Sequence, residues 1–432
     1  MRAGVATADI TPPVGVPLGG FGEGARRLSF PDLNPFTPNT LLAPSRGVRD
    51  PILAKALVLD DGTDRVAIVT LDIFGASAHL VREVVRRVSA RSTVGVAPEN
   101  ILVCASHTHS GPGAISDLRF WELVAMDFFQ PRVLDPMIDR IADAIARADA
   151  SLGPAKLGVA TTSLRGITRN RRVGVSPVYT RDSIDDELAV IRIDRADDTP
   201  LATVTNFAIP GSVLGPDNLR FSADVMGEAS RLIEREGGVA LFANGSQGDI
   251  APDVGSNEAG VVAGGAALGR AVLALRSTIR TREDCDLRCA PEVVDLGPPH
   301  LHLTAGRLRG GLPPAIRAFL QSLGPNLGIT IPLDAAAMDR EYRFTAIRIG
   351  EAVIASVPGE PIHELGLEIK AAGRALGFQA TLVFSLANGH GASFTTEEEY
   401  WAGGYEALAT LYGPQTGTRV AQECARRMNA VR

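Results

Sequence analysis

Short apolar runs of the kind that form buried strands alternate along the chain with longer amphipathic runs of helical period. This alternation constrains the fold more than any other feature, because strands followed by covering helices are typical of α/β proteins. The predicted strands span residues 53–59, 66–71, 101–104, 188–193, 202–207, 239–242, 344–349, 352–357 and 381–384. The predicted helices span residues 79–88, 136–148, 224–235, 261–276 and 362–376.

Two stretches rich in proline and glycine interrupt this pattern. Residues 11–50 form a loop too long for an ordinary connection, and such loops usually cover a functional site or wrap over a surface. Residues 297–335 form a second stretch of this kind. We therefore expect a single domain spanning residues 1–432, and a division into two lobes near residues 297–335 stays open.

Composition excludes several classes of protein. The chain has 432 residues, of which 45% are apolar, so it has ample length for a folded core and is not disordered. Lys and Arg number 43 against 49 Asp and Glu, the net charge is −6, and no basic stripe is present. We therefore expect no nucleic-acid partner. No apolar run approaches the roughly 20 residues that a membrane span needs.

The N-terminus and the cysteines favour a cytoplasmic protein. The first residues lead into a strand-like segment without an apolar signal core, and the four cysteines are too sparse for a disulfide framework. The oligomeric state does not follow from the sequence.

The most informative segment follows the predicted strand 101–104 and carries His107 and His109. Ligands in open α/β sheets bind beyond the carboxyl ends of strands. If the strand continues, both side chains point the same way, because strand side chains repeat every two residues. Two such imidazoles form half of a metal site, although a hydrogen-bonded pair in a tight turn explains this segment equally well.

Two further strand ends carry residues that suit metal binding. Glu360 and His363 follow the predicted strand 352–357, and their spacing of three residues predicts that they share a helical face near the start of the next helix. Glu-x-x-His is a ligand spacing found in metal-binding helices. His390 lies among small residues after the predicted strand 381–384. Taken alone, a helix-capping carboxylate and two structural histidines explain these segments better. However, four of the seven histidines lie at three strand ends, and this clustering favours a metal site.

A glycine-rich segment, residues 242–253, follows another predicted strand. Its backbone could serve as a cradle for an anion or an oxyanion. Ser246 lies in no G-x-S-x-G motif, so the segment does not indicate a serine hydrolase.

Several motifs that occur in one order along the chain resemble those of a known family. They are Ala8-Asp9-Ile10-Thr11-Pro12-Pro13, Ser106-His107-Thr108-His109-Ser110-Gly111-Pro112, Asn206-Phe207-Ala208-Ile209, Gly248-Asp249-Ile250-Ala251-Pro252, Pro358-Gly359-Glu360, Tyr405-Glu406-Ala407 and Tyr412-Gly413-Pro414. Over nearly the whole chain they resemble the N-terminal catalytic domain of the neutral/alkaline, non-lysosomal ceramidase family. The resemblance implies an α/β domain with mixed β-sheets covered by helices. The family's C-terminal β-sandwich domain and secretion signal have no counterpart in the sequence.

The resemblance also implies a zinc-dependent amidase that cleaves an N-acyl bond. The family's metal is held by two His, a Glu and a Tyr, of which the first His corresponds to His107 and the Glu to Glu360. Pro210 stands at the position of the second His, and Ser393 stands at the position of the Tyr. A Ser to which a nucleophilic role is often assigned corresponds to Ala251. Because proline and alanine cannot act as a ligand or a nucleophile, these departures change the chemistry of the site.

Other positions of the family are retained. His109 corresponds to a His beside the metal, Arg171 to an Arg that binds the substrate carbonyl, and Tyr405 to a second Tyr of the site. Catalytic zinc needs about three protein ligands and an open position. We expect His390 to complete the set, with His109 or His363 as a substitute.

The sequence therefore predicts a zinc-dependent hydrolase of an amide or related acyl bond in a soluble small molecule, with metal-activated water as the nucleophile. Two alternatives stay open. The same fold could carry altered chemistry, namely an isomerisation, a cyclisation or an acyl transfer that is metal-free or iron-dependent. The chain could also be an inactive binding homologue, although the polar residues retained at its strand ends argue against decay.

Overall fold

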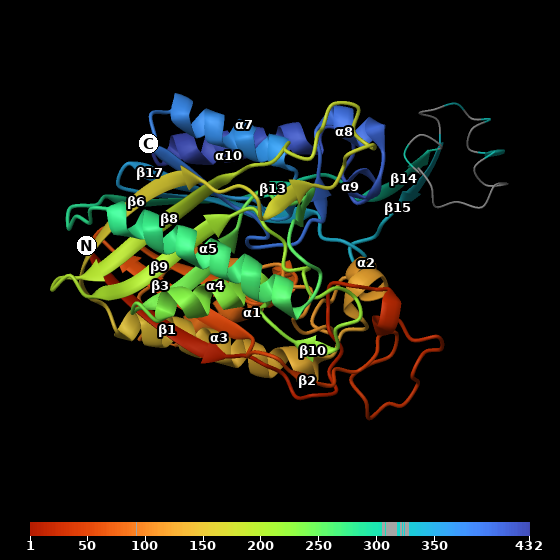
Figure 1. Ribbon diagram of the computed structural model, residues 1–432, viewed down its shortest axis with the longest axis horizontal. Coiled ribbons are helices and arrows are strands. Elements are labelled where there is room, and N and C mark those ends of the chain that lie inside the picture. Colours follow the sequence, from red (N-terminus) through yellow and green to blue (C-terminus); the bar gives the residue numbers. More distant parts are fainter. Residues whose placement is uncertain (92, 305–306, 308–317, 320–321, 323, 325–327) are drawn as a thin grey trace.

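A larger and a smaller β-sheet pack face to face in the computed structural model (Figure 1). The structure describes residues 1–91, 93–304, 307, 318–319, 322, 324 and 328–432. The larger sheet has the strand order β11-β9-β8-β6-β1-β3-β4-β5, and the smaller sheet has the order β13-β16-β17-β19. Both are mixed, because β4–β5, β9–β11 and β17–β19 are parallel pairs whereas their other neighbours run antiparallel.

The strands of the larger sheet are β1 (Arg2–Asp9), β3 (Leu53–Asp60), β4 (Arg65–Leu71), β5 (Ile101–Ala105), β6 (Gly153–Ser163), β8 (Glu187–Arg195), β9 (Pro200–Phe207) and β11 (Val239–Asn244). Those of the smaller sheet are β13 (Leu287–Asp295), β16 (Glu341–Ile349), β17 (Ala352–Ser356) and β19 (Ala380–Phe384).

Alternation of side chains along each strand separates the two faces of the larger sheet. In β3, Ala54 and Ala56 belong to the apolar cluster under the helices, whereas Leu57 and Leu59 belong to the cluster between the sheets. Helices α1 (Ala78–Ser89), α3 (Pro131–Ala150), α4 (Asp224–Glu234) and α5 (Glu258–Thr278) cover the outer face of the larger sheet. Helices α7 (His363–Ala375) and α10 (Thr416–Ala430) cover the smaller sheet. The expected α/β class with mixed sheets covered by helices is confirmed.

The predicted strands and helices all occur, with ends that differ by a few residues. Strands β1, β6 and β13 and helix α10 were absent from the predicted elements. The expectation that no apolar run approaches the length of a membrane span is wrong, because among the described residues α5 is long and apolar enough to cross one by length and composition. It packs closely on α4, since a Cβ added at Gly265 would lie 2.4 Å from Cβ of Glu228. Such packing is typical of a core helix. The four cysteines are free, as expected.

The two proline- and glycine-rich stretches differ in structure. Within the second, β14 (His300–Thr304) pairs with β15 (Gly328–Pro332), while much of the remainder lies outside the described residues. A division into lobes there stays a prediction. The first stretch has little regular structure beyond a 3₁₀ turn, Gly24–Arg26, and the short strand β2 (Gly47–Val48). It reaches the segment after β5, because the amide of Gly19 donates to the carbonyl of Gly111.

The two sheets are joined at the carboxyl ends of β5 and β19. The amide of Ala105 donates to the carbonyl of Leu386, and the amide of Asn388 donates to the carbonyl of Val103. Leu386 and Asn388 adopt left-handed φ angles of 51° and 57°, which are costly for residues other than glycine. Such strain is concentrated at functional sites, and here it brings the segments after both strands together.

Candidate active site

His107 and His109 converge, although not for the reason that the sequence suggests. Strand β5 ends at Ala105, and His107 has a left-handed φ of 64°. The His107 Nδ1 lies 2.8 Å from the carbonyl oxygen of Phe74, which can only accept, so Nδ1 carries the proton. The unprotonated Nε2 of His107 therefore faces Nε2 of His109 at 3.3 Å.

Glu360 completes this cluster from the segment that follows β17 of the smaller sheet. It begins the two-residue strand β18 (Glu360–Pro361), which pairs with β20 (Ser393–Phe394). Its Oε2 lies 3.5 Å from Nε2 of His107, and its Oε1 lies 3.0 Å from Nε2 of His390. The carboxylate is therefore held between two buried histidines.

Packing against Trp121 and Gly75 fixes the position of the His390 side chain. Its ring stacks on Trp121 with the ring centroids 4.0 Å apart, and the Trp121 indole N–H donates to the His390 carbonyl oxygen. Gly75 leaves the space that the imidazole fills, because a Cβ there would lie 2.1 Å from Nδ1 of His390. His390 thus lies beside Glu360, and its expected role as a metal ligand stays a prediction.

Burial and neighbouring charges determine the protonation states of Glu360, His107 and His109. Burial disfavours a charged Glu360, but the nearby His107 and His390 outweigh it and hold the pKa of Glu360 below its ordinary value. Burial lowers the pKa of His107, and burial together with His107 lowers the pKa of His109 well below its ordinary value. At neutral pH the site therefore holds a carboxylate beside two neutral imidazoles.

Arg171 and Tyr405 form the other wall. Arg171 Nε donates to Oε1 of Glu406 at 2.7 Å, and Arg171 Nη2 donates to the Gly248 carbonyl oxygen at 2.7 Å. The guanidinium carbon lies 5.2 Å from the centroid of the Tyr405 ring. Desolvation and the charge of Glu360 raise the pKa of Tyr405 to about 12, so the phenol keeps its proton and can donate.

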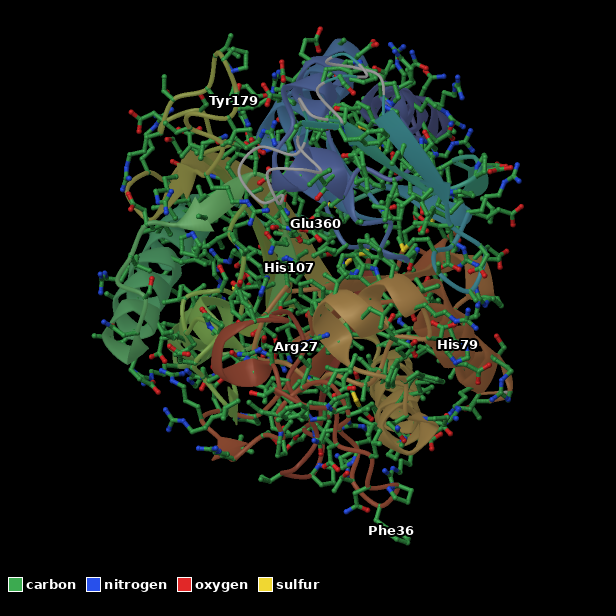
Figure 2. The ribbon with its side chains drawn as sticks, turned by 90° about the vertical axis from the view of Figure 1, so that its right-hand side faces the viewer. Arg27, Phe36, His79, His107, Tyr179 and Glu360 are labelled. Atoms are coloured by element: carbon green, nitrogen blue, oxygen red, sulfur yellow. The ribbon has the colours of Figure 1, made fainter. Side chains whose placement is uncertain are left out.

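These walls enclose a pocket of about 420 Å³. His107, His109 and Glu360 line it as one group, and Arg171 and Tyr405 line it as a second group. Apolar residues and the loop 11–50 supply the remaining wall, which comprises Gly20, Phe21, Gly22, Glu23, Phe74, Val124, Ala125, Pro210 and Ser212. In Figure 2, Glu360 and His107 are neighbours near the centre of this face, with Arg27 of the loop below them.

The prediction that His363 shares a helical face with Glu360 is wrong. Glu360 lies in β18, and α7 begins only at His363, so the Glu-x-x-His spacing is not helical. His363 Nδ1 donates to Oδ2 of Asp249 at 2.6 Å, and its ring packs on Tyr179. Tyr179 lies at the upper rim in Figure 2, away from Glu360.

A zinc site requires ligands that this arrangement does not supply. Pro210 lines the pocket where the resemblance places a histidine, and Ser393 is buried in β20. In the part of the chain that the structure describes, no group of three or more His, Cys, Asp or Glu side chains is arranged to hold a metal ion. His107 and Glu360 face each other, but His390 is turned to the carboxylate as a hydrogen-bond donor. The residues present therefore do not fit the metal, and zinc stays a sequence-based prediction.

Sequence reasoning missed Glu406, which holds Arg171 from behind the pocket. The only signal was its place beside Tyr405. The glycine-rich segment contributes the carbonyl of Gly248 and not an N–H cradle, since the amide of Gly248 donates to the carbonyl of Pro361. Ala251 lies in β12 (Ile250–Pro252), where it pairs with Arg169.

Comparison with protein families gives a consistent result. Residues 40–262 match the model described as neutral/alkaline non-lysosomal ceramidase, N-terminal. The chain is 26% identical to the neutral ceramidase of Pseudomonas aeruginosa over 431 aligned positions, which cover 84% of this chain and 64% of that protein. It is 24% identical to the neutral ceramidase of Mycobacterium tuberculosis over 230 positions, which cover 48% of this chain and 36% of that one. The chain thus spans less than two thirds of the length of these two relatives.

Solved structures show the same fold. The crystal structure of the neutral ceramidase from Pseudomonas aeruginosa superposes with a TM-score of 0.82 at 22% identity, covering 99% of this chain and 74% of that one. A structure described as ceramidase complexed with C2 superposes with a TM-score of 0.79 at 23% identity.

Proposed function

Because the chain belongs to the neutral/alkaline non-lysosomal ceramidase family, we propose that it is an amidase-type hydrolase of N-acyl amides. One observation carries the proposal: a carboxylate beside the neutral His107 and His109 lines the same pocket as an arginine and a protonated tyrosine. Hydrolysis of an amide needs both sets of groups, because water must lose a proton while the carbonyl oxygen gains negative charge.

The two walls divide the reaction between them. Arg171 and Tyr405 donate to the carbonyl oxygen and stabilise the oxyanion that forms when water attacks the carbonyl carbon. Glu360 orients that water, and the neutral pair of His107 and His109 accepts its proton. The proton then passes to the nitrogen as the C–N bond breaks, so the products are a carboxylic acid and an amine. No step is assigned to a metal, because the described donors do not form a three-ligand set.

The pocket suits a substrate with an apolar arm. Phe21, Phe74 and Val124 supply apolar surface around a volume of about 420 Å³, which lies within the usual range for a small ligand. The comparison proteins are named ceramidases, and ceramide and soluble acyl amides share the N-acyl bond. We propose a soluble N-acyl amide in the cytoplasm as the first substrate to assay, with ceramide as its comparison.

The test measures acid and amine release from a panel of N-acyl amides and ceramide by mass spectrometry. Arg171→Ala should lower the rate about 100-fold, the effect of losing an oxyanion donor. Arg169→Ala and Tyr179→Phe are matched controls outside the pocket and should retain the wild-type rate. Binding of acyl amides without hydrolysis would favour the inactive homologue instead, and product formation by acyl transfer to an added amine would favour the altered chemistry.

A further inference from the structure

Glu406 links the pocket to a buried network of charges. Its side chain is buried, and its two oxygens have different partners. Oε1 accepts from Nε of Arg171 at 2.7 Å, and Oε2 accepts from Nη1 of Arg172 at 2.7 Å. A single carboxylate therefore bridges one arginine that lines the pocket and one that does not.

Arg172 fixes Glu406 in turn. The Arg172 side chain is 0% exposed and forms a second ion pair with Glu399, whose Oε2 lies 2.6 Å from Nη2. Its Nη2 also donates to the carbonyl oxygens of Glu399 and Gly403. These contacts tie the segment with α8 (Glu397–Ala402) and α9 (Tyr405–Leu408) to the loop after β7 (Thr168–Asn170).

The bond from Glu406 decides how Arg171 can meet a substrate. A guanidinium is planar, so hydrogen bonds from its Nε to Glu406 and from its Nη2 to the Gly248 carbonyl fix the plane. Among the described residues, Nη1 of Arg171 has no hydrogen-bond partner. That nitrogen is left for the carbonyl oxygen of a bound substrate.

We propose that Glu406 is a positioning residue, which orients Arg171 for the developing oxyanion without touching the substrate. This role rests on the proposed amide hydrolysis. It requires a carboxylate, because a glutamine would present an acceptor to one arginine and an NH₂ group to the other. A small misplacement of an oriented group is enough to lower the rate strongly.

The test is a double-mutant cycle of Glu406→Gln and Arg171→Ala on the best amide substrate. In the wild-type background, Glu406→Gln should lower kcat about 10- to 100-fold and leave KM within about threefold, because an oxyanion contact acts mainly in the transition state. In the Arg171→Ala background it should change kcat by less than about twofold. An equal loss of kcat in both backgrounds would overturn the proposal.

A matched control separates this role from the loss of any buried carboxylate. Glu423 is also buried and also bridges two arginines, Arg426 at 3.0 Å and Arg427 at 2.8 Å, but it lies on α10 away from the pocket. Glu423→Gln should leave kcat unchanged. Should Glu406→Gln not fold, Glu406→Asp takes its place in the cycle, because it keeps both acceptors but shortens their reach.

Crystal structures of the wild type and the Glu406 variant show the position of the Arg171 side chain, and this test does not depend on activity. Arg171 should leave the Gly248 carbonyl in the variant, and an unmoved Arg171 would refute the inference. If the wild type hydrolyses no amide while Arg171 moves as expected, the proposed function fails and the positioning by Glu406 stands.

Discussion

Two of the buried histidine–carboxylate pairs among the described residues look equivalent until their surroundings are compared. His390 and Glu360 are 3.0 Å apart, and His363 and Asp249 are 2.6 Å apart, with all four side chains buried. Both carboxylate oxygens of Asp249 already accept hydrogen bonds, because the side-chain amide of Asn170 and the backbone amide of His363 also donate to them. Glu360 instead turns its second oxygen toward His107 and the pocket.

The difference shows that burial and pairing do not by themselves identify a reactive group in this fold. A saturated carboxylate stabilises the junction between loops, whereas one that faces a cavity can meet a substrate. Both pairs follow strand ends, so the position in the topology does not distinguish them. The two pairs are distinguished by whether the carboxylate faces the pocket and whether one of its oxygens is free to accept a hydrogen bond. Both properties depend on the tertiary structure.

The largest effect is expected for Glu360→Gln. This change keeps the shape of the side chain but removes the charge that orients the attacking water, and it leaves His107 beside an amide. We expect the rate to fall by about 1000-fold, which is the upper range for loss of a positioned acid–base group combined with lost orientation. Steady-state rates of amide cleavage test this. A loss below tenfold would remove Glu360 from the reaction and erase the distinction between the two pairs.

His390→Asn should lower the rate about tenfold or more. It removes the donor to Oε1 of Glu360 and opens a gap against Trp121, so the carboxylate loses one of its two orienting histidines. The kinetic constants of this variant are compared with those of His363→Asn, the same substitution in the other pair. Equal losses in both variants would mean that the effect is structural.

His363→Asn should change stability and not rate. The asparagine amide can still donate to Asp249, but loss of the ring leaves a gap against Tyr179, which costs about 2–4 kcal/mol. Urea unfolding measures this loss, and the rate per folded molecule should stay within about twofold of the wild type. A larger loss of rate at unchanged stability would assign His363 to the site.

The pH profile provides a further distinction. Because burial lowers the pKa of His107 and His109, both stay neutral and able to accept a proton at a pH below the ordinary histidine value of about 6.5. The rate should therefore differ by less than about twofold between pH 6.5 and 8, and its decline should begin at lower pH. A decline centred at or above about 6.5 would contradict the neutral pair.

The sequence predicted much of the fold and part of the site. Regular elements followed from apolar periodicity, because each strand and helix buries one face locally. The convergence of His107, Glu360 and His390 was predictable from their strand ends. The position of His363 outside the site could not be predicted in this way. Whether a helix begins before or after Glu360 depends on the pairing of β18 with β20. Glu406 was missed because its partners lie more than 200 residues away in the chain.

Removal of metal is expected to change the rate of amide cleavage least. It also tests directly whether Glu360 is a metal ligand. If the carboxylate works through His107 and His390 alone, treatment with a chelator such as EDTA should leave the rate within about twofold, and elemental analysis should find far less than one zinc per chain. If Glu360 is a ligand as the sequence predicts, chelation should abolish the rate and added zinc should restore it. In that event His390 must turn its Nε2 lone pair from a proton to the metal, and His390→Asn should lower zinc content as well as rate. His363→Asn should leave zinc content unchanged in either case, because the wild-type imidazole is hydrogen-bonded to Asp249 and is not a ligand.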